Sequence, residues 1–197
     1  MLKKNINYFN NVKGANFSLD FKAFKLNWYF NNIYKLNYFL SNVLPKYETG
    51  SLTGNLENIK YSIGEAYFMR AYEYFVRYQK FGDFPIVTEP LKDDLASLVA
   101  ASKREPRNEV ARFILSDLDK AIEMMGDVKQ PTTRISADLA RLLKSRVALF
   151  EGTWLKYFNG TAFVPNGEGW PGKDKNPDYV YPAGDIDNEI TYFLDIA

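Results

Sequence analysis

The chain has 197 residues, of which 46% are apolar and 25% are charged, the ordinary balance of a globular protein with a real core. Its net charge of +1 gives no electrostatic basis for binding nucleic acid or an anionic membrane, and no apolar run reaches the roughly 18 residues of a spanning helix. Cysteine and histidine are absent, which excludes disulfides, Cys-based zinc sites and histidine acid–base chemistry. We therefore expect no cofactor, no metal and no catalysis.

The first residues form a weakly patterned lead-in. Residues 1–17 are polar and rich in asparagine, and polar residues stand where a signal peptide would have its apolar stretch. Ser18 is the expected N-cap of a first helix from Phe21 to Leu44, which Pro45 should end. Asn37 lies beside the apolar face of that helix. We expect its amide to hydrogen-bond a neighbouring loop or helix end, with ligand contact as the alternative.

A loop rich in glycine, serine and asparagine follows, and then a second helix from about Ile59 to Phe81. Gly82 can adopt the positive φ that ends a helix, and Phe84 is extended because Pro85 follows it. Gly64 and the alanines of this helix keep it thin, which favours close packing against other helices.

The third long helix should run to Met125, with Gly126 as its end. A short helix is expected before it, around residues 93–100. The sequence Ser102-Lys-Arg-Glu105 fits a capping box for the long helix, with Pro106 in its first turn. We expect Asp117 to be solvated and paired with a residue one turn away.

A fourth helix is expected after Thr133 or Ser136, either of which can cap it, and it continues to Trp154. Three of its charged residues invite assignment to a site, but surface positions and stem-packing arginines are the more common roles for such residues. These residues are Arg141, Arg146 and Glu151.

From residue 156 to residue 184 glycine, proline and aromatic residues exclude a regular helix, and loops of this length are usually functional or disordered. Asp185 should cap a last helix over residues 186–197, which ends within its apolar face. We therefore expect a chain truncated at its C-terminus.

Two stretches resemble the signatures of SusD/RagB-type proteins. The first is G-E-A-x-F-x-R-A-x-x-Y-F from Gly64 with F-G-D-x-P-I-V-T-E-P-L from Phe81. The second is R-x-S-A-x-L-A-x-L-L-K-S-R-V-A-L-F-E-G-T-W from Arg134. The resemblance implies an all-α fold of tetratricopeptide-like hairpins, with about four long helices plus a truncated fifth. Residues 18–197 would then be the N-terminal part of a SusD-like helical domain.

The resemblance also implies a function. SusD-type proteins are non-catalytic lipoproteins that bind glycans at the outer membrane surface and sit on a TonB-dependent, SusC-like transporter. The acylated cysteine of that family does not occur in this sequence. A helical-repeat scaffold that binds proteins is the alternative, since such hairpins commonly do so.

Ligand contacts cannot be carried over by motif, and we expect them in the long loop at Trp170, Tyr179 and Tyr181. These bulky aromatic residues suit stacking on sugar rings. They could equally cap the core beneath the loop. Carboxylates on the second helix and in the late loop could in principle cleave a glycoside, but the sequence places no two of them at a catalytic separation. The segment DKNPD at residues 174–178 is only a weak calcium signal, because it lacks the EF-hand spacing.

Overall fold

A computed structural model describes residues 29–126, 128, 131 and 133–197, and the regular secondary structure of these residues is almost entirely helical. The helices are α3 (Asn31–Glu48), α4 (Leu56–Phe81), α5 (Leu95–Ala101), α6 (Arg107–Met125), α7 (Ala137–Phe158) and α8 (Ile186–Ile196), with a 3-10 turn, η1, at Lys173–Lys175. In these described ranges, β-pairing is limited to one antiparallel bridge between Phe84 and Glu105. The prediction of an all-α fold is confirmed.

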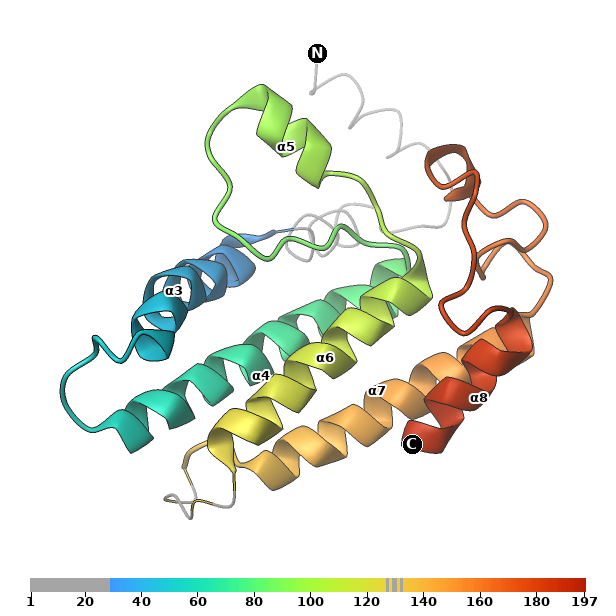
Figure 1. Ribbon diagram of the computed structural model, residues 1–197. Helices are drawn as coiled ribbons and strands as arrows, with labels where there is room; N and C mark the ends of the chain where they lie inside the picture. Colours follow the sequence, from blue (N-terminus) through green and yellow to red (C-terminus); the bar gives the residue numbers. More distant parts are fainter. Residues whose placement is uncertain (1–28, 127, 129–130, 132) are drawn as a thin grey trace, which may run out of the picture. The chain divides into compact units, whose positions relative to one another are not determined.

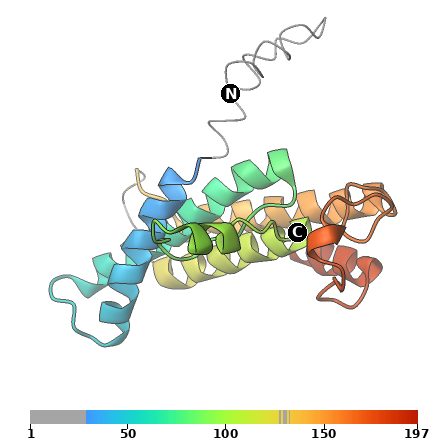
Figure 2. The ribbon, with the colours of Figure 1, turned by 90° about the horizontal axis from the view of Figure 1, so that it is seen from above.

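Helices α4, α6 and α7 lie side by side, with α6 in the middle, and α8 packs on α7 (Figures 1 and 2). The close approach of α4 and α6 depends on Gly64. A Cβ atom at this position would lie 2.7 Å from Cγ of Met125 and 3.0 Å from the carbonyl oxygen of Ala121. Real Cβ atoms do not approach a side chain that closely, so only glycine permits this separation of the two helices.

Local signals placed most helix ends correctly. The side chain of Asn55 accepts a hydrogen bond from the backbone of Asn58 and begins α4 earlier than expected, at Leu56. Gly82 and Gly126 follow α4 and α6 with φ of 64° and 55°. Of the two candidate caps for α7, Ser136 caps it. Asp185 caps α8, as expected.

The first described helix departs from its predicted bounds. Residues 18 and 21–28 lie outside the described residues, and α3 begins at Asn31 and continues past Pro45 to Glu48. The prediction that Pro45 ends this helix was wrong. Pro45 cannot donate a hydrogen bond to the carbonyl of Ser41, but both residues are exposed, so water can satisfy that carbonyl.

The predicted capping box before α6 was also wrong. Glu105 precedes Pro106 and is therefore excluded from the helical region, just as Phe84 is by Pro85. The two extended residues pair with each other, each donating its N–H to the other's carbonyl at 3.2 Å. Consequently α6 begins only at Arg107. Its first N–H donates instead to Oδ1 of Asp83, at 2.9 Å, in the segment that leaves α4.

Asp117 is fully buried rather than solvated. Its carboxylate accepts two hydrogen bonds from the guanidinium of Arg70, at 2.7 and 2.8 Å, and this pair joins α6 to α4. Arg70 also donates to the side-chain oxygen of Asn37, whose amide in turn donates to the carbonyl of Val87 at 2.8 Å. The expected role of Asn37, as a hydrogen-bond donor to a neighbouring loop, is confirmed. The network attaches α3 and the segment after α4 to the bundle.

Residues 32–197 form one compact unit. Within the part of the chain that the structure describes, no helix combines the length and the apolar character needed to cross a membrane. The predicted division at residue 17 falls outside the described residues and stays a prediction.

Candidate functional site

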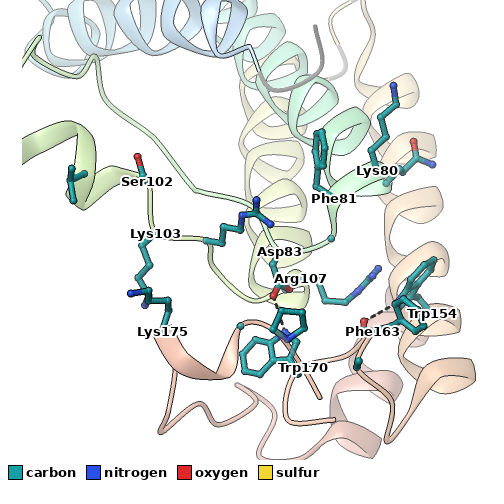
Figure 3. Close-up of a pocket in the computed structure, with 17 residues that line it drawn as sticks. Lys80, Phe81, Asp83, Ser102, Lys103, Arg107, Trp154, Phe163, Trp170 and Lys175 are labelled. Atoms are coloured by element: carbon teal, nitrogen blue, oxygen red, sulfur yellow. Dashed lines mark hydrogen bonds between the residues drawn. The ribbon is translucent and has the colours of Figure 1, made fainter. Parts of the chain in front are cut away.

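A pocket of about 740 Å³ opens where the end of α4, the start of α6, the end of α7 and the loop 159–185 meet (Figure 3). Val99 and Ser102, at the end of α5, also line it. The pocket walls are therefore contributed by segments that are up to about half of the chain apart in sequence, and their relative position is fixed by the helix bundle beneath them.

Four lining side chains are aromatic: Phe81, Trp154, Phe163 and Trp170. Phe163 is 61% exposed, whereas Trp154 is half-buried. The indole N–H of Trp154 donates to the carbonyl of Phe163 at 3.1 Å, and the two rings meet edge to face with centroids 6.5 Å apart. This bond ties the loop to the last turn of α7. It leaves aromatic surface open to a ligand.

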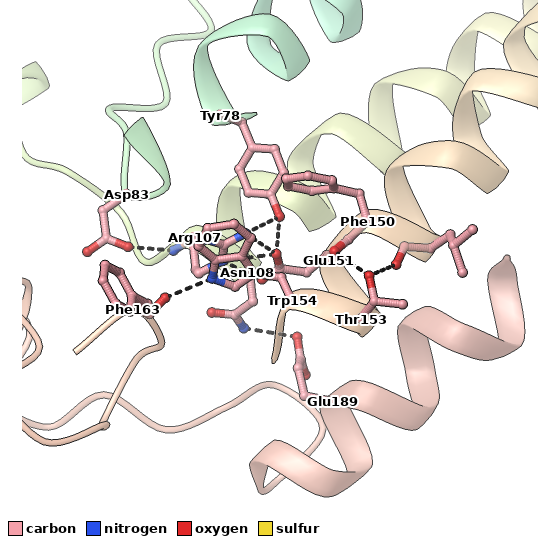
Figure 4. Close-up of polar contacts among 11 residues, drawn as sticks. Tyr78, Asp83, Arg107, Asn108, Phe150, Glu151, Thr153, Trp154, Phe163 and Glu189 are labelled. Atoms are coloured by element: carbon pink, nitrogen blue, oxygen red, sulfur yellow. Dashed lines mark hydrogen bonds and ion pairs between the residues drawn. The ribbon is translucent and has the colours of Figure 1, made fainter. Parts of the chain in front are cut away.

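A buried polar cluster supports the Trp154 side of the pocket (Figure 4). The guanidinium of Arg107 lies 4.2 Å from the ring centroid of Trp154 and forms an ion pair with Glu151 at 2.7 Å. Arg107 also donates to the hydroxyl of Tyr78 at 2.8 Å, and that hydroxyl donates to Glu151. Burial raises the pKa of the Glu151 carboxyl, although Arg107 opposes the shift. Burial likewise raises the pKa of Tyr78 well above its usual value.

The prediction that Glu151 is a surface charge was therefore wrong, because the side chain is completely buried. Arg141 and Arg146 of the same helix are exposed, as expected. The difference follows from Arg107, which supplies a countercharge and hydrogen-bond donors to Glu151 where this part of α7 packs on α6. A buried carboxylate needs both.

Asp83 connects the loop to the bundle. Its Oδ1 accepts from the backbone of Arg107, and its Oδ2 accepts from the indole N–H of Trp170 at 2.8 Å. Burial raises the pKa of Asp83, and both hydrogen bonds oppose that shift. Gly172 packs against this contact, since a Cβ there would lie 2.3 Å from the Trp170 ring and 2.8 Å from Asp83 Oδ2.

A second cluster holds the later part of the loop. The hydroxyl of Tyr179 donates to Oδ1 of Asn108 at 2.8 Å, and the Asn108 amide donates to the buried carboxylate of Glu189 at 2.9 Å. Arg112 adds two hydrogen bonds to Glu189, at 2.7 and 2.8 Å. Loop, α6 and α8 are thus joined through side chains that are largely shielded from water.

The structure brings the three residues predicted from the sequence into one aromatic cluster. Ring centroids lie 5.8 Å apart for Trp170 and Tyr179, and 5.5 Å apart for Tyr179 and Tyr181. Trp170 and Tyr181 are only 5% and 6% exposed, and the hydroxyl of Tyr181 donates to the carbonyl of Pro165. Only Trp170 lines the pocket. Their burial favours the core-capping alternative, and their contact with a ligand stays a prediction.

Sequence reasoning missed Trp154, Phe163 and Arg107. A signal was present for the aromatic pair, because Trp154, Phe158 and Phe163 cluster where the fourth helix gives way to the loop. Their rings do meet in the structure, with the centroids of Trp154 and Phe158 4.5 Å apart. Arg107 carried no such signal, since its partners are 29 and 44 residues away.

The remaining carboxylates considered for catalysis or metal binding are held in ion pairs or are scattered. Glu65 pairs with Arg134 at 2.6 Å, and Glu73 pairs with Arg77. Over the described ranges, no group of three or more acidic side chains gathers closely enough to hold a metal ion.

A family model described as "Starch-binding associating with outer membrane", of SusD-like type, matches residues 4–149. The chain belongs to the SusD-like family. The resemblance carried by the two sequence signatures is thereby confirmed. The lining residues of α4, α5 and the start of α6 lie within the matched range, whereas Trp154 and the loop residues of the pocket lie after it.

Individual SusD-like relatives match a part of the chain. SusD-like protein P2 of Formosa agariphila is 33% identical over 104 residues, which are 53% of this chain and 20% of the relative. A crystal structure of a SusD-like protein from Bacteroides fragilis aligns with a TM-score of 0.50 and 27% identity, over 62% of this chain and 23% of that one. A laminarin-binding SusD-like protein shares the fold, with a TM-score of 0.50 and 23% identity over 61% of this chain and 25% of its own. The chain spans about a fifth to a quarter of the length of these relatives.

Proposed function

We propose that this SusD-like protein is a non-catalytic, surface glycan-binding component of a polysaccharide uptake system. The observation that carries the proposal is the pocket between α4, α6, α7 and the loop. It combines open aromatic surface at Phe163 and Trp154 with polar side chains such as Gln79 and Ser102. A sugar ring has apolar faces that stack on aromatic rings and hydroxyl groups that hydrogen-bond to such polar groups.

The pocket is preformed, because contacts within the protein hold its walls in place without a ligand. Trp154 rests on Arg107, and the loop is attached through Asp83 and Asn108 before any ligand arrives. A preformed site loses less conformational entropy when it binds its ligand. The predicted residue Trp170 would contribute to such a site through the part of its ring that reaches the pocket.

Burial of the paired carboxylates supports a non-catalytic role. Glu151 and Glu189 are both fully buried and are engaged by Arg107 and Arg112. A general acid or nucleophile must reach the glycosidic oxygen or the anomeric carbon, and these two carboxylates face arginines instead. We expect no release of reducing sugar when the protein is incubated with a polysaccharide that it binds.

The binding proposal is tested by affinity gel electrophoresis against a panel of polysaccharides, followed by calorimetry with the oligosaccharide of the best one. Phe163→Ala removes an exposed ring, so the fold should persist while affinity falls about fivefold. Tyr157→Ala is the matched control, because Tyr157 is 80% exposed and lies outside the pocket. Absence of retardation by every polysaccharide would overturn the proposal.

Partner and location are part of the same proposal. A SusC-like TonB-dependent transporter at the outer membrane would receive the glycan, in keeping with the description of the family model. Co-purification of such a transporter with the protein from its own cells tests this, and recovery of the protein alone from the outer membrane fraction would count against it.

A protein-binding scaffold is a second candidate, favoured by an apolar face on α7. Leu139, Leu142 and Leu149 share one side of this helix and are 45%, 70% and 51% exposed. Apolar residues that gather on a surface are typical of protein contacts. Leu142→Asp should abolish such a contact and leave glycan binding intact. If it weakened glycan binding instead, this surface would belong to the first function.

A further inference from the structure

Cationic side chains dominate the charged lining of the pocket. Five of its residues are lysine or arginine, namely Lys80, Lys103, Arg104, Arg107 and Lys175, and Asp83 is the one carboxylate among the lining residues. The chain as a whole is nearly neutral, with a net charge of +1. The positive charge at the pocket is therefore a local concentration.

Arg107 and Asp83 already have hydrogen-bond or ion-pair partners within the protein. Arg107 is paired with the buried Glu151, and Asp83 is held by the indole of Trp170 and the backbone of Arg107. Asp83 also interacts electrostatically with Arg104. The carboxylate that could repel an anionic ligand is thus turned toward protein donors. The lysines at the rim set the charge that a ligand meets.

Lys103 and Lys175 come from different segments and lie on the same side of the pocket (Figure 3). Lys103 follows α5, and Lys175 ends η1 in the long loop. The ion pair of Lys103 with Glu105 is long, at 3.5 Å, and its side chain is 46% exposed. Two ammonium groups on one rim repel each other, and an anion placed between them lowers that cost.

We propose that the pocket selects acidic saccharides, whose carboxylate or sulfate ester lies between Lys103 and Lys175. This inference rests on the proposed function. The apolar face of the same or the next sugar ring then stacks on Phe163 and Trp154. Neutral glycans can use only the second set of contacts. The net charge of only +1 gives no electrostatic basis for binding a long, uniformly charged polymer such as nucleic acid.

The test compares pairs of oligosaccharides that share one backbone. Calorimetry is run with oligogalacturonate and its methyl ester, and with a sulfated galactan oligosaccharide and its desulfated form. We expect at least one acidic member to bind about tenfold more tightly than its neutral partner, and salt to weaken only the acidic member. The first pair reports recognition of a carboxylate and the second reports recognition of a sulfate.

Variants then locate the effect. The double variant of Lys103→Gln and Lys175→Gln should remove the preference for the acidic member while leaving affinity for the neutral one unchanged. Lys46→Gln is the matched control, because Lys46 is exposed on α3 and does not line the pocket. Phe163→Ala should weaken both members equally.

Failure of this inference is distinguishable from failure of the proposed function. Equal binding of acidic and neutral members, or an acidic preference that survives in the double lysine variant, overturns the inference and leaves glycan binding standing. Binding of polyglutamate as tight as that of the acidic oligosaccharide also overturns it, since charge alone would then suffice. Absence of binding to every saccharide overturns both.

Discussion

Two buried ion pairs join the middle helix α6 to its neighbours, and they serve different ends. Arg70–Asp117 connects it to α4, and Arg107–Glu151 connects it to α7. Both have an N–O distance of 2.7 Å and a carboxylate with no exposed surface. The difference lies in the remaining N–H groups of each arginine.

Arg70 donates one of them to Asn37, which holds the segment after α4 by its backbone. Arg107 donates to Tyr78, and its guanidinium lies against the indole of Trp154 at the pocket. The Arg70–Asp117 pair thus joins helices and a connecting segment within the fold, whereas the Arg107–Glu151 pair supports the aromatic surface of the pocket. Replacing a buried ion pair by apolar residues is often neutral, whereas removing one partner is costly. The comparison can therefore be tested one partner at a time.

The largest effect is expected from Asp117→Ala. It leaves the buried guanidinium of Arg70 without a countercharge, so the free energy of unfolding should fall by about 3–5 kcal/mol in urea denaturation. Saccharide affinity of the folded fraction should not change, because Asp117 does not line the pocket. Combining Arg70→Met with Asp117→Leu should restore most of the stability. A loss below about 1 kcal/mol for Asp117→Ala would show that the pair is not structurally required.

Glu151→Gln sharpens the comparison, because it keeps the shape of the side chain and removes the charge. Hydrogen bonds to charged groups contribute about 1.5–3 kcal/mol, and a loss of that size is expected here. Unlike Asp117→Ala, this change should also weaken saccharide binding, since Trp154 rests on Arg107. Calorimetry on the folded variant measures this change in saccharide affinity. Unchanged affinity would mean that the cluster supports the helices alone.

Trp170→Phe should have a smaller and more local effect. It removes the N–H donor to Asp83 and costs about 1–2 kcal/mol, the typical penalty for an unsatisfied, partly buried acceptor. Hydrogen exchange should quicken in residues 159–185, while the amides of α4 and α6 near Arg70 stay protected. Uniform acceleration over all the helices would instead make Trp170 part of the general core.

The smallest effect is expected at an exposed ion pair between the same two helices that Arg107 and Glu151 join. Lys144 of α7 contacts Asp119 of α6 at 2.5 Å, but the side chains are 25% and 57% exposed. Lys144→Gln should lower stability by about 0.2–1 kcal/mol, and 0.5 M salt should abolish the difference. A larger or salt-independent loss would show that burial is not what separates the two pairs.

Sequence reasoning succeeded where one turn of chain decides the structure. Gly82, Gly126 and Asp185 act within a few residues and each marked a helix end correctly, and Ser136 was one of the two caps predicted for α7. It failed where a contact with a residue distant in sequence replaced the contact that the local pattern predicted. The residues Ser102 to Glu105 had a capping pattern, but the first N–H of α6 donates to the carboxylate of Asp83, 24 residues earlier.

The buried charges and the pocket could not be predicted from local sequence patterns for a related reason. A carboxylate such as Asp117 has the same neighbours in sequence whether it is solvated or buried, and its arginine partner is 47 residues away. The pocket likewise combines Phe81, Trp154 and Trp170, which only the packing of the helices brings together. For the loop aromatics, composition predicted one cluster of rings, but it does not show that Trp170 and Tyr181 are buried or that only Trp170 of the three predicted residues lines the pocket.

Asp83 has a consequence for how a ligand can act on this protein. One of its oxygens caps α6 and the other holds Trp170, so the start of a central helix and the position of the loop share one carboxylate. A ligand that displaces Trp170 would weaken the α6 cap, and a disturbance of the α6 cap would loosen Trp170 by the same free energy, because such coupling is reciprocal. At a binding site of this kind, a bulky ligand would therefore be disfavoured through helix stability as well as through steric fit.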